Sequence, residues 1–203
     1  MDRPNRREVS AAATRDEILR AARRLFTSHG YANTSIQQIA AESGVAVQTI
    51  YTSVGSKAAL VLALNDLIDS EAGVSELGGE LGRETRPGQL LAKGVHLTRV
   101  LNERCGDIIR VVISAEATDP DLAAAHADGM RRHREGAEGL GQRLAGLGAL
   151  RPGTSADQAA MAFALMTAPA SWLQLTEDAG WSWDEAESWL ATSLSRLLLR
   201  RGR

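Results

Sequence analysis

The residue types that most often carry catalysis are few in this 203-residue chain, and their spacing does not favour it. The candidates are four histidines and one cysteine: His29, His96, His126, His133 and Cys105. The histidines lack the spacing of metal ligands, and Cys105 has no obvious base near it in the sequence. The chain also lacks a Gly-x-Ser-x-Gly sequence and a phosphate-binding loop. We therefore expect no catalytic residue, no metal and no cofactor.

A short polar stretch offers a different chemistry, which is contact with the bases of a nucleic acid. The side-chain amide of Gln48 can form a bidentate pair with adenine. Val47 and the methyl group of Thr49 can touch the methyl group of thymine, and Thr52 lies close by in the sequence. These contacts require a short helix that presents the four side chains to a major groove of DNA.

The residues that lead into this stretch have the spacing of a helix-turn-helix. Ala40 is small where two helix backbones must approach, and Gly44, four residues later, suits a turn that needs a positive φ. Val45 and Ile50 are apolar where the second helix of the pair meets the first. This pattern is typical of a DNA-binding helix-turn-helix, but a plain αα-hairpin in a helical bundle has it too. Spacing alone leaves both interpretations open.

The elements around this pair are all predicted to be helices, so the expected fold class is all-α. Thr14 and Glu17 match a capping box, and the apolar residues that follow recur on one face of a helix. We therefore expect a first helix over residues 15–29, which Gly30 ends by taking a left-handed conformation.

The next three helices are expected to be short or of moderate length. Thr34 and Ser35 can each cap the second helix, and their hydroxyls and the neighbouring amides can contact a phosphate. A third helix is expected over residues 47–53. Ser56 caps a fourth helix, whose first turn contains Lys57, an ammonium group that we expect to lie on a phosphate.

Ten residues between positions 34 and 60 together resemble a known family pattern. They are Thr34, Ile39, Ala40, Gly44, Val45, Ile50, Tyr51, Ser56, Lys57 and Leu60. Five residues of the preceding segment match as well: Ala22, Leu25, Phe26, Gly30 and Tyr31. In type and spacing, they resemble the TetR family of transcriptional regulators over about residues 12–70.

The resemblance implies an N-terminal three-helix DNA-binding head with a helix-turn-helix, followed by a larger C-terminal helical domain for ligand binding and dimerisation. Tyr51 resembles the phosphate-binding tyrosine of the family. The chain departs from the family at Ala46, Ser53 and Val54, where Ser or Thr, His or Tyr, and an aromatic residue are usual. Ala46 removes a helix cap that is typically worth about 1 kcal/mol. An alternative is therefore a helical protein-interaction module of the same fold with weak or lost DNA binding.

Charge and glycine content also divide the chain. Residues 1–60 carry eight basic and five acidic residues, a balance of +3, whereas the remainder carries fifteen and twenty, a balance of −5. An anionic partner would thus meet the N-terminal part. A glycine-rich patch begins at Gly73 and marks a joint. We expect three segments: a flexible basic arm over 1–13 with Arg3, Arg6 and Arg7, the helix-turn-helix domain over 14–71, and the helical body over 72–203.

The segment 159–175 is apolar nearly all round, so a helix there must be buried on more than one side. It contains polar residues and Pro169, which favour a buried, kinked helix over a membrane span. The resemblance implies that this helix and the last one form a four-helix dimer interface. The interface residues expected on the last helix are Trp189, Leu190, Leu194 and Leu197. The alternative is that both helices complete the core of the monomer.

The resemblance also implies a small-molecule pocket in the body. Phe163, Met166 and Trp172 are candidates for its lining, although each is also suited to an ordinary core or interface. The sequence thus predicts a cytoplasmic TetR-like regulator with no membrane partner. We expect a repressor that binds a palindromic operator in double-stranded DNA as a homodimer and is released by an unknown small-molecule effector.

Overall fold

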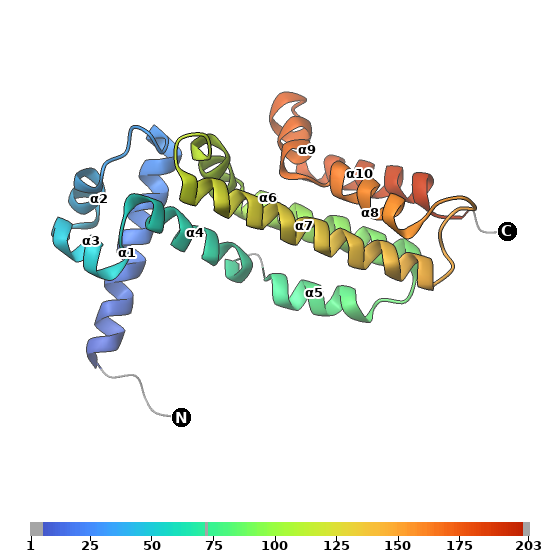
Figure 1. Ribbon diagram of the computed structural model, residues 1–203, viewed down its shortest axis with the longest axis horizontal. Helices are drawn as coiled ribbons and strands as arrows, with labels where there is room; N and C mark the ends of the chain where they lie inside the picture. Colours follow the sequence, from blue (N-terminus) through green and yellow to red (C-terminus); the bar gives the residue numbers. More distant parts are fainter. Residues whose placement is uncertain (1–5, 72, 201–203) are drawn as a thin grey trace. The chain divides into compact units, whose positions relative to one another are not determined.

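The computed structural model describes residues 6–71 and 73–200, which are almost entirely helical (Figure 1). The α-helices are α1 (Arg6–His29), α2 (Ile36–Ser43), α3 (Val47–Ser53), α4 (Lys57–Glu71), α5 (Val74–Arg83), α6 (Pro87–Ala115), α7 (Pro120–Gly146), α8 (Ala156–Met166), α9 (Pro169–Leu173) and α10 (Trp183–Leu198). A π-helical turn, Gln174–Asp178, follows α9. These residues contain no strand, so the expected all-α class is confirmed. Over the same residues no single helix is long and apolar enough to cross a membrane, although α3 and the start of α4 reach that composition as a bent pair.

The chain folds into two compact units. The first unit contains Met1–Ile68 and Asp107–His126, and the second contains Asp69–Gly106 and Ala127–Arg203. The chain therefore enters the first unit twice, because the end of α6 and the start of α7 pack with the N-terminal helices. We call residues 107–126 the α6–α7 corner. We expected a single domain boundary after residue 71. The structure instead places the α6–α7 corner, which follows that boundary, in the first unit.

The first helix begins earlier than the sequence suggested. α1 starts at Arg6, and Thr14, the expected cap, lies inside the helix. There its hydroxyl donates to the carbonyl oxygen of Ser10 at 3.0 Å, a bond within one helix turn that caps nothing. The arm expected over residues 1–13 is therefore helical from Arg6 onward, whereas Arg3 lies outside the described residues.

The helix-turn-helix has the expected caps and turn. Of the two hydroxyls that could begin α2, the structure uses that of Ser35, which forms a capping box with Gln38. Gly44 ends α2 with a φ of 69°, a conformation that side-chain-bearing residues rarely adopt. α2 and α3 both pack against α1 (Figure 1). These helices and α4 contribute buried apolar side chains to the core of the first unit: Ile18, Phe26, Ile39, Ile50, Leu60 and Val61.

The second unit has a core of its own, to which α6, α7, α8, α9 and α10 contribute. Its buried residues include Leu91, Val95, Leu140, Leu144, Phe163, Trp172, Leu190 and Leu194. Burying a side chain of this size stabilises the fold by about 1.5–3 kcal/mol. α7 is one continuous helix despite its glycines, and Gly141 lies where its backbone closely approaches α8.

The segment 159–175 is not one kinked helix, which corrects the expectation. α8 ends at Met166, and Pro169 begins the separate helix α9. A proline in the first position of a helix has no amide hydrogen to leave unpaired, so it starts a helix more readily than it bends one. Ser155 and Ser182 begin α8 and α10 with capping boxes.

Candidate DNA-recognition surface

α3 is anchored by one buried side chain and leaves its other faces open. Ile50 has 0% of its surface exposed and packs into the core of the first unit. None of the five residues expected to contact DNA from this helix is buried: Val47, Gln48, Thr49, Tyr51 and Thr52. In this seven-residue helix, Ile50 therefore anchors α3 to the core, and these five side chains form an accessible surface.

This surface offers an amide, a phenol and methyl groups. Tyr51 is 51% exposed, so its hydroxyl can reach a phosphate outside the protein. The hydroxyl of Thr52 faces its own helix, where the carbonyl oxygens of Gln48 and Thr49 lie at 3.0 and 3.1 Å. Ala46 precedes α3 and provides no side-chain cap, as its residue type predicted.

One contact that the sequence did not reveal holds the end of α3 against α1. The guanidinium Nη1 of Arg15 donates to the carbonyl oxygen of Ser53 at 2.8 Å. A carbonyl at the C-terminal end of a helix carries partial negative charge, so a cation there is stabilising. No local signal links these two residues, because the bond depends on the packing of α3 against α1.

The turn before α2 uses both hydroxyls internally; this corrects the expected phosphate contact of Thr34, which is buried, whereas that of Ser35 stays a prediction. Thr34 is only 3% exposed, and its hydroxyl faces the carbonyl oxygens of Gly30 at 2.9 Å and Leu25 at 3.2 Å. The hydroxyl of Ser35 accepts from the amide of Gln38 and lies 3.0 Å from its side-chain oxygen. Both residues therefore shape the start of α2.

Lys57 also points inward rather than toward a phosphate. Its Nζ donates to the carbonyl oxygens of Tyr31 at 2.7 Å and Thr34 at 3.0 Å, and it lies 4.0 Å from the centroid of the Tyr31 ring. Burial lowers the pKa of Lys57, and the negative charge of Asp119 partly opposes that change. The ammonium group donates to two carbonyl oxygens of the turn, and this is the physical reason for the correction.

Two side-chain contacts join α1 and the turn after it to the α6–α7 corner. The hydroxyl of Tyr31 donates to Oδ2 of Asp119 at 2.6 Å. The guanidinium of Arg23 donates to both carboxylate oxygens of Asp107, at 2.7 and 2.9 Å. Burial raises the pKa of Asp107, but the hydrogen bonds and charge of Arg23 outweigh it, so the net shift is downward. Both contacts lie within the first unit.

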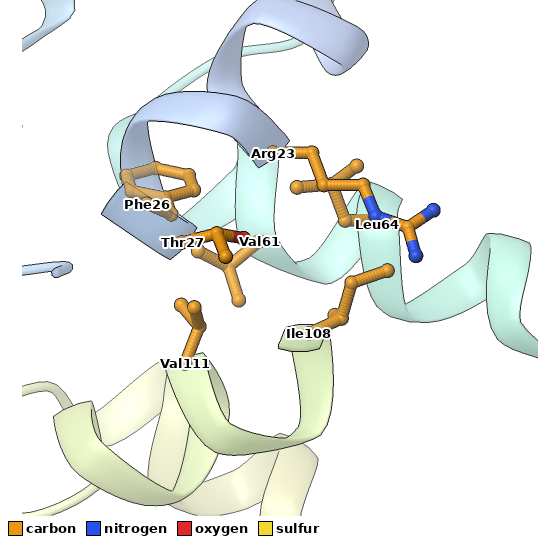
Figure 2. Close-up of a pocket in the computed structure, with 7 residues that line it drawn as sticks. All are labelled: Arg23, Phe26, Thr27, Val61, Leu64, Ile108 and Val111. Atoms are coloured by element: carbon orange, nitrogen blue, oxygen red, sulfur yellow. The ribbon is translucent and has the colours of Figure 1, made fainter. Parts of the chain in front are cut away.

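The first unit also contains a largely apolar recess, shown in Figure 2. Side chains of α1 and α4 face those of the end of α6 across it. Its lining consists of Arg23, Phe26, Thr27, Val61, Leu64, Ile108 and Val111. The α6–α7 corner thus supports the helices behind the recognition surface through apolar packing as well as hydrogen bonds.

Among the described residues, no group of three or more His, Cys, Asp or Glu side chains is placed to hold a metal ion. Several polar groups of the first unit, among them Arg15, Arg23 and Lys57, are instead engaged with backbone carbonyls or carboxylates. This arrangement suits recognition of another molecule by a shaped surface.

The sequence of this surface has a family match. Residues 18–64 match the family model described as bacterial regulatory proteins, tetR family. The N-terminal domain belongs to the tetR family. The match begins within α1 and ends within α4, so it contains the complete helix-turn-helix and every residue of α3.

Solved structures share the fold of nearly the whole chain. NalD of Pseudomonas aeruginosa, the secondary repressor of the MexAB-OprM multidrug efflux pump, is 22% identical over 95% of this chain and 99% of its own, with a TM-score of 0.77. A TetR transcriptional regulator from Chloroflexus aurantiacus is 24% identical over 95% and 99%, with a TM-score of 0.71. SmeT, in a complex with triclosan, is 20% identical over 94% and 93%, with a TM-score of 0.73. A search of curated proteins finds no match. At these identities the similarity establishes a common fold.

The residues expected at a dimer interface divide into two groups. Leu190 and Leu194 are 1% and 0% exposed and belong to the core of the second unit, which corrects their assignment. Trp189 and Leu197 are 47% and 52% exposed. The apolar stripe of α10 is wide, so Leu190 and Leu194 on one side of it pack in the core while Trp189 and Leu197 on the other side stay exposed.

The residues expected to line a ligand pocket are part of the packing around the core. Phe163 and Trp172 are 4% and 0% exposed, and Met166 is partly buried against the same cluster. The indole nitrogen of Trp172 donates to the hydroxyl of Thr98 at 3.3 Å. A pocket lined by these side chains stays a prediction.

Proposed function

We propose that this tetR-family protein is a transcriptional regulator that binds double-stranded DNA through the exposed surface of α3. The observation that carries the proposal is the division of α3 between a buried Ile50 and five unburied residues. A helix presented in this way fits the major groove, where amide and methyl groups distinguish base pairs. Gln48 supplies the amide, and Tyr51 supplies a phosphate contact at the edge of the groove.

We further propose that the protein acts as a homodimer on a palindromic operator. A single helix-turn-helix contacts few base pairs, and two related by symmetry recognise half-sites about 34–36 Å or a multiple of this apart. Four large apolar side chains are exposed on α8 and α10: Met161, Leu165, Trp189 and Leu197. The two helices pack together, and their buried faces contribute to one core. A second copy would cover the uncovered side chains.

The proposed mode of action is repression relieved by a small-molecule effector bound in the body. Two proteins with the same fold support it, because NalD is a repressor and SmeT forms a complex with triclosan. Phe163, Met166 and Trp172 are the proposed lining residues. They are apolar and aromatic, so the effector class that fits them is a small molecule with a substantial apolar surface.

DNA binding is tested by fluorescence anisotropy with the duplex upstream of the gene for this protein, and with duplexes selected from a random library. Gln48→Ala is expected to weaken binding to the preferred duplex by about 1–3 kcal/mol and to relax base preference at one position per half-site. Gln37, exposed on α2, gives a matched glutamine control. Affinity should fall steeply as salt rises, because phosphate contacts release counterions. A wild-type protein that binds no duplex more tightly than random DNA refutes the proposal.

Self-association is tested by sedimentation equilibrium of a variant that changes only an uncovered side chain. Leu197→Glu should yield folded monomers with weaker DNA binding, because a carboxylate replaces an apolar contact. Asp184→Glu on the same helix is the control, since Asp184 is exposed and already acidic. A Leu197→Glu protein that remains a dimer at micromolar concentration contradicts the assigned interface. Leu194→Glu is unsuitable, because it would place a charge in the core.

A second candidate is a protein-interaction module of the same fold with weak DNA binding. The observation that favours it is Ala46, which leaves α3 without a side-chain cap. The two candidates differ in the anisotropy experiment, because an interaction module would show neither a preferred duplex nor an effect of Gln48→Ala.

A further inference from the structure

The placement of α2, and through it of α3, depends on the turn that joins α1 to α2. This turn begins with Gly30, whose φ is 79°, and the amide of Thr34 donates to the carbonyl oxygen of Tyr31 at 3.2 Å. The carbonyl oxygens of Tyr31 and Thr34 both face the ammonium of Lys57. α2 starts directly after this turn and packs against α3. A shift of the turn would therefore move the recognition surface.

One carboxylate outside the matched family segment holds this turn in place. Asp119 accepts the hydroxyl of Tyr31 on Oδ2 at 2.6 Å, and its Oδ1 accepts the amide of Asp121 at 3.0 Å. The second bond fixes the carboxylate at the start of α7, where it acts as a helix cap. Asp119 is thus anchored to the α6–α7 corner with one oxygen and to the turn with the other.

The charge of Asp119 also complements the partly buried ammonium of Lys57. The Tyr31 ring lies against Lys57, so the hydroxyl of that ring and the ammonium belong to one connected group. The hydrogen bond from Tyr31 lowers the pKa of Asp119, and the charge of Lys57 adds to this effect. The carboxylate therefore stays ionised at neutral pH, which strengthens the bond from the phenol.

We propose that Asp119 is a positioning residue for DNA binding, which fixes the turn before the helix-turn-helix through the hydroxyl of Tyr31 without touching DNA. This inference rests on the proposed function of α3. It adds a determinant of affinity that lies in the connection between α6 and α7, far from α3 in the sequence. Asp119 sets how firmly the recognition surface is held, and the exposed residues of α3 set which bases it contacts.

The test compares Asp119→Asn, Tyr31→Phe and the double variant with Asp121→Asn as a control. Asp121 carries the same charge two residues away but does not accept the hydroxyl of Tyr31. Asp119→Asn should weaken binding to the preferred duplex about tenfold, since a charge-assisted hydrogen bond is lost. Tyr31→Phe should have a similar effect, and the double variant should be no weaker than either single one. Asp121→Asn should change affinity less than twofold.

The salt dependence separates positioning from direct contact with DNA. A lost phosphate contact reduces the slope of log affinity against log salt by roughly one unit. Because Asp119 touches no phosphate in the proposal, Asp119→Asn should leave the slope unchanged while affinity falls. Equal affinities of Asp119→Asn and Asp121→Asn would overturn the proposal, as would additive effects of the two changes in the double variant.

Hydrogen exchange in the absence of DNA tests the same contact without relying on DNA binding. Asp119→Asn and Tyr31→Phe should each accelerate amide exchange at Thr34 and Ile39 several-fold and leave α10 unaffected. If Asp119→Asn does not fold, Tyr31→Phe removes the same bond and keeps the aromatic ring. Unchanged exchange in both variants refutes the positioning role. Faster exchange in a protein whose wild type binds no duplex would instead refute the proposed function alone.

Discussion

A single methyl group added at Gly141 should destabilise this protein, although alanine is the better helix former. Gly141 is buried in α7 at its crossing with α8. A Cβ atom there would lie 2.4 Å from the carbonyl oxygen of Ala156 and 3.1 Å from both N and Cβ of Ala160. The nearest of these atoms belongs to the backbone, so a side-chain rotation cannot relieve the clash. α7 and α8 would have to separate.

The expected magnitude follows from two opposing effects. Replacing glycine by alanine inside a helix gains up to about 1 kcal/mol in helix propensity. Overpacking a tight helix contact costs roughly 1–3 kcal/mol, and the cost is toward the upper end here because backbone atoms clash. We expect Gly141→Ala to lower the free energy of unfolding by about 1–2 kcal/mol. Gly139→Ala is the matched control, since Gly139 is exposed in the same helix and has no atom within 4 Å of its Cβ position.

The two alanine substitutions should therefore change the free energy of unfolding in opposite directions. Gly139→Ala should raise stability by about 0.5–1 kcal/mol, which leaves a difference of about 2 kcal/mol between the variants. Urea unfolding followed by circular dichroism measures this difference directly. In a chain of this size, 1 kcal/mol shifts Tm by about 2–4 °C. Equal stabilisation by both substitutions would refute the close approach of α7 to α8.

Three further variants test other contacts. Ala46→Ser should stabilise the fold by about 1 kcal/mol in urea unfolding, because it supplies the missing cap of α3. Arg23→Gln should raise the pKa of Asp107, measured by NMR titration, and lower the free energy of unfolding at pH 7 by roughly 1–3 kcal/mol. Hydrogen bonds from Arg86 lower the pKa of Glu84 from 4.5 to about 2, so its contribution is present above pH 4.5 and is lost as the pH falls toward 2. Acid unfolding should accordingly show a stability difference between wild type and Glu84→Gln that shrinks over this range.

The parts of the structure that the sequence predicted correctly are those decided within a few residues. A hydroxyl cap of α2 from Thr34 or Ser35, of which the structure uses Ser35, Gly44 as the left-handed end of α2 and Ile50 as the anchor of α3 all follow from local spacing. A cap needs an amide three residues away, and a turn needs a residue that tolerates positive φ. Such requirements are visible in a single sequence.

The direction in which polar side chains point was predicted less well. Lys57 and Thr34 were expected to face phosphates, but each donates to backbone carbonyl oxygens of earlier residues. Leu190 and Leu194 were expected at an interface, but the core of the second unit covers them. For Lys57 and the two leucines the outcome depends on partners that are distant in the sequence, whereas Thr34 bonds to carbonyl oxygens only four and nine residues earlier. A wide apolar stripe can face either a core or a subunit interface. A basic residue in the first turn of a helix can face either a phosphate or a backbone carbonyl.

Residues inside and outside the segment that matches the family model should affect DNA binding differently: those on α3 its base specificity, and those outside the segment its affinity. The matched segment ends at residue 64, yet two of the contacts that hold it come from Asp107 and Asp119. Neither residue belongs to the surface of α3 that we propose contacts bases. Substitutions on α3 should therefore change which duplex is preferred, because they alter base contacts. Substitutions at Asp119 should weaken binding to all duplexes by a similar factor, because they loosen the support of the whole surface.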